Sequence, residues 1–311
     1  MESKPILPPR LRRGDTIGLF CPAGPLRDPG RLQAGIKLIE DLGFAVKLRG
    51  PVEFGQGYLA DSDERRAEHM HGLWNDEEVR AILAIRGGYG CLRMIERLDW
   101  ELFRRLPKFL VGFSDVTVLL NNLVDRAGLV ALHGPMVSTL ARSGEQGVVS
   151  LFSLLTGEFE ERIKPKGVEI LRGGTGRGRL VGGNLTTLVH LLATPWESAW
   201  EDCILVLEDT GESLYRLDRM LTHLAQAGRL QRLAGLVLGD FDTGVDELAN
   251  LRLQEEVWAR VLELAPPGYP IWARFPLGHR ERNLTLPMGM EAVLDSGAGM
   301  LQLLPESVTL A

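Results

Sequence analysis

Short apolar runs alternate with longer amphipathic stretches along most of the chain, and this alternation limits the folds that it can adopt. Residues 16–21, 79–85 and 109–112 form apolar runs of strand length. Residues 32–42 carry apolar side chains at helical spacing, and we predict a helix that ends at Gly43. Strands that alternate with helices build parallel sheets covered by helices. We therefore predict an α/β fold.

The amino-acid composition changes after residue 156. Residues 157–183 are rich in Gly, Lys, Arg and Glu, and Gly173-Gly-Thr-Gly-Arg-Gly178 is typical of flexible or tightly turning backbone. We therefore predict an N-terminal domain at residues 1–156, a linker region at 157–178 and a C-terminal domain at 179–311. Two domains also suit a chain of 311 residues, at roughly 100 to 200 residues per domain. The C-terminus is predicted to form a hairpin around Ser296-Gly-Ala-Gly299.

The charge balance disfavours two classes of partner. The chain has 35 Lys and Arg against 41 Asp and Glu, a net charge of -6. Such a chain lacks the basic surface that phosphate backbones require, so we expect neither nucleic acid nor a membrane surface as a partner. The N-terminus has no apolar signal segment, and no run approaches the roughly 18 apolar residues of a membrane span. We expect a cytoplasmic protein.

The cysteine and histidine patterns favour neither a disulfide framework nor a metal site. Cys21, Cys91 and Cys203 lie in or beside apolar runs without C-x-x-C spacing, so we predict buried, reduced thiols. The six histidines include no H-E-x-x-H motif. We expect no metal and no cofactor.

Ser114 is the best candidate nucleophile because it lies where a strand runs directly into a helix, in Leu110-Val-Gly-Phe-Ser-Asp115. A sharp turn there exposes the serine oxygen, and the helix N-terminus offers backbone N–H groups to a developing oxyanion. Val116 stands where G-x-S-x-G has its second glycine, so the motif is incomplete. Ser114 or Asp115 as a simple helix N-cap is the alternative.

A second candidate element is the glycine-rich turn Arg86-Gly-Gly-Tyr-Gly90, which follows a predicted strand. Its glycines let the backbone approach a ligand closely and present N–H groups to an anion. The order fits neither the dinucleotide-binding nor the P-loop pattern. A tight turn without function is the alternative.

These patterns leave the base and the acid of a serine hydrolase open between two candidates each. His133 closes a predicted strand, and His279 lies in a polar loop, where functional side chains concentrate. Glu208 and Asp209 end an apolar strand at the edge where open α/β sheets bind their ligands. Either carboxylate is also suited to cap the following helix. Spacing alone decides neither pair.

Taken together, these segments resemble the LD-carboxypeptidase family, serine peptidases that include muramoyltetrapeptide carboxypeptidase and the microcin C self-immunity proteins. The resemblance covers nearly the whole chain. The segments that carry it, in order, are Gly14-Asp-Thr-Ile-Gly18, Pro22-Ala-Gly24, Gly57-Tyr-Leu-Ala-Asp-Ser-Asp-Glu-Arg65, Arg86-Gly-Gly-Tyr-Gly90, Gly112-Phe-Ser-Asp115, His133-Gly-Pro135, Gly182-Gly-Asn-Leu185, Leu207-Glu-Asp209, Tyr215-Arg-Leu-Asp-Arg-Met-Leu221, Gly278-His279 and Asn283.

The resemblance implies a flavodoxin-like N-terminal domain with a parallel sheet and a smaller C-terminal swivelling β/α domain. It implies a triad of Ser114 as nucleophile, His279 as base and Glu208 as the orienting acid, with the serine in the first domain and its partners in the second. Backbone N–H groups of Asp115 and Gly88 would hold the oxyanion.

The implied activity is L,D-carboxypeptidase cleavage of the terminal D-Ala from murein tetrapeptides during cytoplasmic peptidoglycan recycling. One alternative keeps the triad and takes a peptidyl- or aminoacyl-nucleotide antibiotic as substrate, with Trp196 and Trp200 as candidate adenine-stacking residues. Another is a non-catalytic protein that binds an anion at the glycine-rich turn. The family resemblance also allows a homodimer.

Overall fold

The computed structural model describes residues 4–52 and 57–311. The chain divides into two compact units. Unit 1 comprises Met1–Phe159, Glu281–Gly289 and Val308–Ala311, and unit 2 comprises Glu160–Arg280 and Met290–Ser307. Within the described ranges, no helix is long and apolar enough to cross a membrane.

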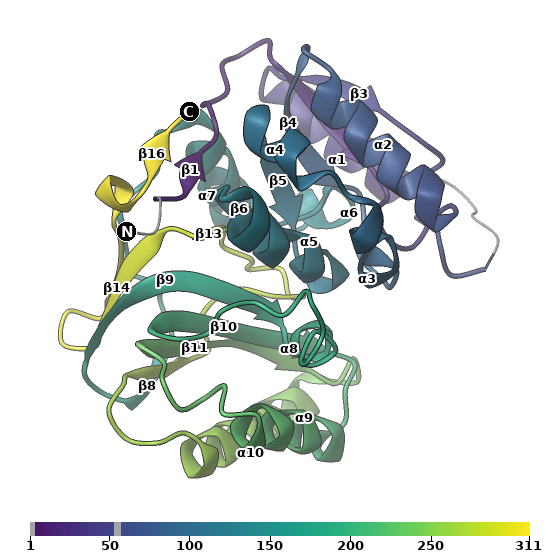
Figure 1. Ribbon diagram of the computed structural model, residues 1–311. Helices are drawn as coiled ribbons and strands as arrows, with labels where there is room; N and C mark the ends of the chain where they lie inside the picture. Colours follow the sequence, from purple (N-terminus) through teal and green to yellow (C-terminus); the bar gives the residue numbers. More distant parts are fainter. Residues whose placement is uncertain (1–3, 53–56) are drawn as a thin grey trace. The chain divides into compact units, whose positions relative to one another are not determined.

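The core of unit 1 is a six-stranded sheet (Figure 1). All neighbouring strands are parallel except the edge strand β13, which runs antiparallel to β6 with Leu286 opposite His133. The five parallel strands follow the order 2-1-3-4-5 of flavodoxin-like sheets, as predicted. Across the sheet the strands are β13 (Leu286–Met288), β6 (Ala131–His133), β5 (Phe109–Gly112), β4 (Val79–Ala84), β2 (Thr16–Phe20) and β3 (Ala45–Leu48).

Helices pack on both faces of this sheet because its central strands, β2, β4, β5 and β6, are mostly apolar and buried. Ile39 of α1, Val137 of α6 and Leu151 of α7 bury one face, while Leu73 of α2 packs beside Gly18 on the other. The helices of unit 1 are α1 (Pro29–Asp41), α2 (Asp63–Asn75), α3 (Cys91–Met94), α4 (Trp100–Arg105), α5 (Thr117–Asn122), α6 (Val137–Leu140) and α7 (Gly144–Thr156), with single turns at Ile95–Arg97, Ser114–Val116 and Leu123–Ala127. Strands β1 (Ile6–Leu7) and β16 (Thr309–Leu310) form a separate parallel pair.

Unit 2 is built on an eight-stranded mixed sheet whose four central strands, β9 to β12, are parallel. Antiparallel strands flank them, including the predicted hairpin of β14 and β15. Across the sheet the strands are β7 (Arg162–Ile163), β15 (Met300–Leu303), β14 (Glu291–Asp295), β9 (Thr175–Asn184), β10 (Cys203–Thr210), β11 (Gly235–Asp242), β12 (Ile271–Ala273) and β8 (Glu169–Arg172).

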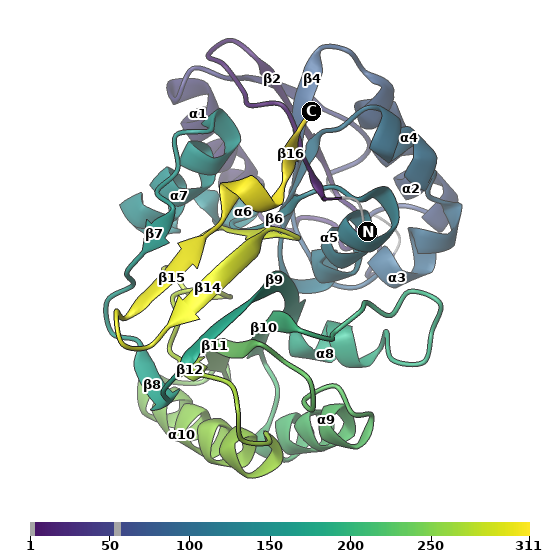
Figure 2. The ribbon, with the colours of Figure 1, turned by 60° about the vertical axis from the view of Figure 1, so that its left-hand side comes forward.

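One face of this second sheet is covered by three helices, α8 (Leu185–Val189), α9 (Leu214–Gln226) and α10 (Glu247–Leu264) (Figure 2). Leu188, Leu221 and Val257, one from each helix, join the same buried cluster as the strand residues Leu205 and Leu236. A single turn at Pro305–Ser307 follows β15.

The glycine-rich segment 157–178 differs from the predicted linker, because it contains β7, β8 and the first residues of β9. Two of its glycines, Gly176 and Gly178, allow close packing. A Cβ at Gly176 would lie 1.8 Å from the carbonyl oxygen of Ala234, and one at Gly178 would lie 2.3 Å from that of Asp202. These two positions of β9 therefore exclude any side chain.

Candidate active site

Ser114 lies in a strained turn directly after β5. Its φ of 61° falls in the left-handed region, which side chains other than glycine rarely adopt. Strain of this kind is typical of nucleophiles held on a strand-to-helix turn. Neither Ser114–Val116 nor α5 has a side-chain N-cap, which argues against the capping alternative. A Cβ at Gly112 would lie 2.7 Å from Val116 Cγ1, so valine and glycine pack together across this turn.

The strain predicts that Ser114→Gly is more stable than Ser114→Ala. Glycine adopts positive φ without steric cost, whereas alanine keeps the roughly 1 to 2 kcal/mol penalty of the left-handed region. We expect a difference in unfolding free energy of about 1 kcal/mol, because greater chain entropy in the unfolded state offsets part of the gain. Urea unfolding of the two variants measures this difference. Equal stability would show that the turn is relaxed.

The glycine-rich turn after β4 lies against Ser114. A Cβ at Gly87 would be 3.0 Å from Ser114 Cβ and 3.1 Å from its Oγ, so glycine is needed for this approach. Gly88 has a φ of 121° and lies beside Gly24, whose N–H donates to Gly87 O at 3.1 Å. The carboxyl ends of β2, β4 and β5 thus bring together three of the predicted positions, Ser114, Asp115 and Gly88.

A buried guanidinium fixes this edge of the sheet. Arg66 is fully buried, and its Nη1 donates to Gly90 O at 2.9 Å and also to Pro22 O. Its Nη2 pairs with Asp63. One side chain therefore ties the loop after β2 to the glycine-rich turn after β4. Sequence reasoning missed Arg66, because its i,i+3 pairing with Asp63 looks like an ordinary helix surface pair.

Asp115 holds the same edge through its side chain. Its Oδ2 accepts a hydrogen bond from Cys91 N at 2.8 Å, at the start of α3. Burial raises the pKa of this carboxyl, although the bond from Cys91 N opposes the shift. The carboxylate thus anchors α3, and only the backbone N–H of Asp115 is a candidate oxyanion donor. Cys21, Cys91 and Cys203 are buried and form no disulfide with one another, as predicted.

In unit 2, His279 and Glu208 form a hydrogen-bonded pair. His279 Nδ1 lies 2.7 Å from Glu208 Oε2. The Glu208 side chain is fully buried, while that of His279 is 22% exposed. Gly278 has a φ of 119°, and a Cβ there would lie 3.1 Å from Glu208 Oε2. The glycine before the histidine therefore makes room for the carboxylate.

The pair fits a general base with an orienting acid. Burial alone would lower the pKa of His279, but the charge and hydrogen bond of Glu208, together with the charges of Asp209 and Asp242, outweigh it, and the net shift is upward. A carboxylate on Nδ1 leaves Nε2 as the proton acceptor of the neutral imidazole. The arrangement can accept a proton from a hydroxyl and return it to a leaving amine.

Asp209, the neighbouring carboxylate, binds the start of α8 rather than His279. Its Oδ2 accepts from the backbone N and Oγ1 of Thr186, both at 2.8 Å, and its Oδ1 accepts from Asn184 Nδ2 at 3.2 Å. Burial, followed by the charge of Glu208, raises the pKa of Asp209 to about 6. A register shift between Leu207 and Asp209 in the pairing with β11 accompanies these separate roles.

The other candidate base lies in unit 1. His133 is fully buried on β6, and its ring centroid is 6.0 Å from that of Phe113. His279, by contrast, contacts the buried carboxylate of Glu208. Asp240, which the sequence did not single out, lies close enough to Glu208 for their charges to interact. Its Oδ1 is 3.9 Å from Arg280 Nη1. Burial raises the pKa of Asp240 to about 6.

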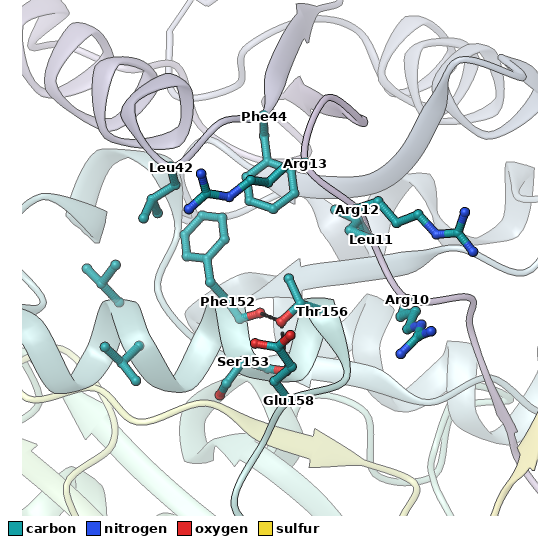
Figure 3. A pocket seen from close by; sticks show the side chains of 12 residues that line it. Arg10, Leu11, Arg12, Arg13, Leu42, Phe44, Phe152, Ser153, Thr156 and Glu158 are labelled. Atoms are coloured by element: carbon teal, nitrogen blue, oxygen red, sulfur yellow. Dashed lines mark hydrogen bonds between the residues drawn. The ribbon is translucent and has the colours of Figure 1, made fainter.

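Two cavities lie on unit 1. One of about 450 Å³ opens beside the glycine-rich turn and is lined by Gly24, Pro25, Arg27, Tyr58, Arg86, Gly88 and Tyr89. The other, of about 750 Å³, includes residues that precede β2 and β3, such as Arg13 and Phe44, so it lies at the opposite edge of the sheet (Figure 3). It holds none of the predicted site residues. Among the described residues, no cluster of three or more His, Cys, Asp or Glu is suited to a metal ion.

Comparison with known families matches both halves of the chain. The model of the LD-carboxypeptidase N-terminal domain matches residues 17–134, and that of the LD-carboxypeptidase C-terminal domain matches residues 177–294. The chain belongs to the LD-carboxypeptidase family. This membership confirms the resemblance seen in the sequence and makes the protein a serine-type carboxypeptidase.

Individual relatives of this LD-carboxypeptidase are similar over their full length. The murein tetrapeptide carboxypeptidase of Pseudomonas aeruginosa is 34% identical over 296 residues, which cover 90% of this chain and 92% of the relative. The structure of a muramoyltetrapeptide carboxypeptidase from Oxalobacter formigenes has a TM-score of 0.75 at 30% identity, covering 93% and 97% of the two chains. The structure of an MccF-like protein from Bacillus anthracis has a TM-score of 0.84 at 27% identity, covering 96% and 99%.

Proposed function

We propose that this protein is an L,D-carboxypeptidase that removes the terminal D-Ala from murein tetrapeptides in cytoplasmic peptidoglycan recycling. The observation that carries the proposal is the 2.7 Å contact between His279 and the buried carboxylate of Glu208. The strained Ser114 supplies the matching nucleophile. The P. aeruginosa relative, named a murein tetrapeptide carboxypeptidase, supports the substrate.

The reaction begins with proton transfer from Ser114 Oγ to His279 Nε2 as Oγ attacks the carbonyl carbon before the terminal D-Ala. Glu208 keeps the Nδ1–H of His279 oriented and stabilises the imidazolium that forms. Backbone N–H groups of Asp115 and Gly88 hold the oxyanion. The C–N bond then breaks, and His279 returns the proton to the departing amine of D-Ala.

Deacylation repeats these steps with water as the nucleophile. His279 takes a proton from water, the hydroxide attacks the acyl-enzyme ester, and Ser114 Oγ leaves with the proton. Both halves require Ser114 Oγ and His279 Nε2 to come within hydrogen-bond reach, about 2.6 to 3.2 Å, when substrate is bound.

A carboxypeptidase must also recognise a free terminal carboxylate. The cavity beside the glycine-rich turn is lined by Arg27 and Arg86 and lies next to Ser114 through Gly87 and Gly88. Guanidinium groups bind carboxylates through paired hydrogen bonds. This cavity is our candidate for the carboxylate of the departing D-Ala.

The antibiotic alternative loses part of its sequence support. Trp200 is only 4% exposed and belongs to the buried cluster of unit 2, so it offers no stacking surface for adenine. Trp196 is half-buried. The similarity to the MccF-like protein keeps a nucleotide conjugate as one arm of the test.

The test is mass spectrometry of the purified protein with L-Ala-γ-D-Glu-meso-diaminopimelate-D-Ala. We expect release of D-Ala from this stem, and no release from a matched stem that ends in L-Ala. A peptidyl-nucleotide conjugate forms the second arm. Cleavage of the conjugate alone would contradict the murein assignment. If neither compound is cleaved and a serine-directed covalent probe does not label Ser114, a non-catalytic anion-binding protein is the better description.

A further inference from the structure

A cavity of about 510 Å³ in unit 2 lies between two neighbouring helices, α8 and α9. Figure 1 shows α8 beside the ends of β10 and β11 and α9 below it, and Leu188 of α8 and Leu221 of α9 belong to the same buried cluster. We call this cavity the α8–α9 groove. Its lining residues are Thr186, Val189, His190, Glu212, Tyr215, Arg216, Arg219, Met220 and His223.

Two arginines give the groove its positive charge. The guanidinium carbons of Arg216 and Arg219 lie 5.9 and 5.7 Å from the ring centroid of Tyr215. Arg216 is partly neutralised, because its Nη1 lies 3.4 Å from Glu212 Oε2. Within the described ranges, Arg219 pairs with no carboxylate, so its charge is available to a ligand.

These arginines lower the pKa of the Tyr215 hydroxyl. Its ring is exposed, and the hydrogen bond and charge of Arg216, with a smaller contribution from Arg219, lower the pKa of its hydroxyl. His190 and His223 add ring nitrogens at the groove lining, while Val189 and Met220 supply apolar surface. The groove suits a ligand that carries an anionic group on a partly apolar chain.

A short hydrogen-bonded path connects the groove to the base. Thr186 lines the groove and donates to Asp209 through both its backbone N and its Oγ1, each at 2.8 Å. Asp209 follows Glu208, the residue that binds His279. The path from the groove to the candidate base therefore consists of the hydrogen bonds from Thr186 to Asp209, the step from Asp209 to Glu208, and the contact between Glu208 and His279, all within unit 2.

We propose that the α8–α9 groove binds a free carboxylate of the substrate's peptide stem and that Arg219 anchors it. This inference rests on the proposed function and adds a specificity-determining residue to it. A murein tetrapeptide carries two internal carboxylates, the α-carboxylate of D-Glu and the side-chain carboxylate of diaminopimelate. Both present the planar acceptor pair that a guanidinium binds in a bidentate manner.

The test measures kcat and KM of Arg219→Gln with three substrates: the free stem, the stem amidated at D-Glu and the stem amidated at diaminopimelate. With the free stem we expect KM to rise about tenfold to a hundredfold, the range for losing a charge-assisted hydrogen bond, and kcat to stay within about threefold. For the wild-type protein, amidation of the carboxylate that Arg219 binds should raise KM by the same factor. The amidated stem that shows this increase identifies the carboxylate. For Arg219→Gln, the same amidation should leave KM unchanged, because the guanidinium that binds the carboxylate is already absent.

The matched control is Arg252→Gln, an exposed arginine on α10 whose loss should leave KM unchanged. Arg219→Lys should recover part of the affinity, because lysine keeps the charge but lacks the planar fork. The proposal is wrong if Arg219→Gln behaves like Arg252→Gln, or if amidation at each position weakens the variant as much as the wild type.

A binding measurement separates this inference from the proposed function. Calorimetric titration of the free stem into Ser114→Ala and into Ser114→Ala/Arg219→Gln needs no turnover. If wild type releases no D-Ala but the double variant binds at least tenfold more weakly, the activity assignment fails and the groove stands. If wild type releases D-Ala and the two variants bind equally, the groove fails and the activity stands.

Discussion

Replacing Ser114 with alanine is expected to lower kcat/KM for D-Ala release by about a thousandfold to a millionfold. Loss of a triad nucleophile removes the covalent route and leaves only binding and oxyanion stabilisation. The change removes one oxygen atom and keeps the Cβ, so it places no new steric demand on the backbone of residue 114. Chromatographic quantification of D-Ala over long incubations measures the residual rate.

Ser153→Ala is the control for this prediction, because Ser153 is a helical serine of α7 whose hydroxyl donates to Ser150 O. It should retain wild-type turnover. A serine-directed probe should add its mass to wild type and to Ser153→Ala but not to Ser114→Ala. Turnover of Ser114→Ala within tenfold of wild type would assign the nucleophile to another residue.

The second large effect is expected for Glu208→Gln, which should lower kcat by roughly a hundredfold to ten-thousandfold. Glutamine keeps the shape of the buried side chain, but it no longer carries the charge that stabilises the imidazolium of His279. It can also favour the wrong imidazole tautomer, with the proton on Nε2. Glu255→Gln, an exposed change on α10, is the control and should leave kcat unchanged.

The pH dependence of kcat/KM tests the roles of His279 and Glu208 directly. Only neutral His279 accepts a proton, so kcat/KM falls as the pH falls through its pKa. Glu208, together with the charges of Asp209 and Asp242, outweighs burial and raises that pKa, which places the acidic limb above the ordinary value of about 6.5. Removing the negative charge should move the limb to lower pH in Glu208→Gln. An unchanged limb would mean that another group controls the acidic side.

Local patterns were sufficient for the parts of the fold that depend on neighbours in sequence. The apolar runs of β2, β4 and β5 and the junction at Ser114 were all predicted, because hydrophobic periodicity is a local signal. Very short strands such as β7 and β13 were missed, since two or three residues carry no periodicity. Gly176 and Gly178 suggested flexibility, yet their role depends on carbonyl groups far along the chain.

The choice of base and acid lies beyond any local pattern. Glu208 and His279 are 71 residues apart, and nothing near either one distinguishes it from Asp209 or His133. What separates them is tertiary. Asp209 binds Thr186, His133 lies fully buried in unit 1, and Gly278 opens space for the carboxylate. The family resemblance implies the pair, and the contact between His279 Nδ1 and Glu208 Oε2 supports that proposal.

The course of the chain between the two units restricts how this protein can be divided. It passes from one unit to the other after residues 159, 280, 289 and 307. A fragment that ends at residue 159 therefore lacks β13 and β16, which leaves β6 as an open sheet edge and β1 without its partner. Neither unit corresponds to one uninterrupted stretch of the gene. Exchange of substrate specificity between relatives by a single genetic crossover would consequently mix parental segments inside one sheet.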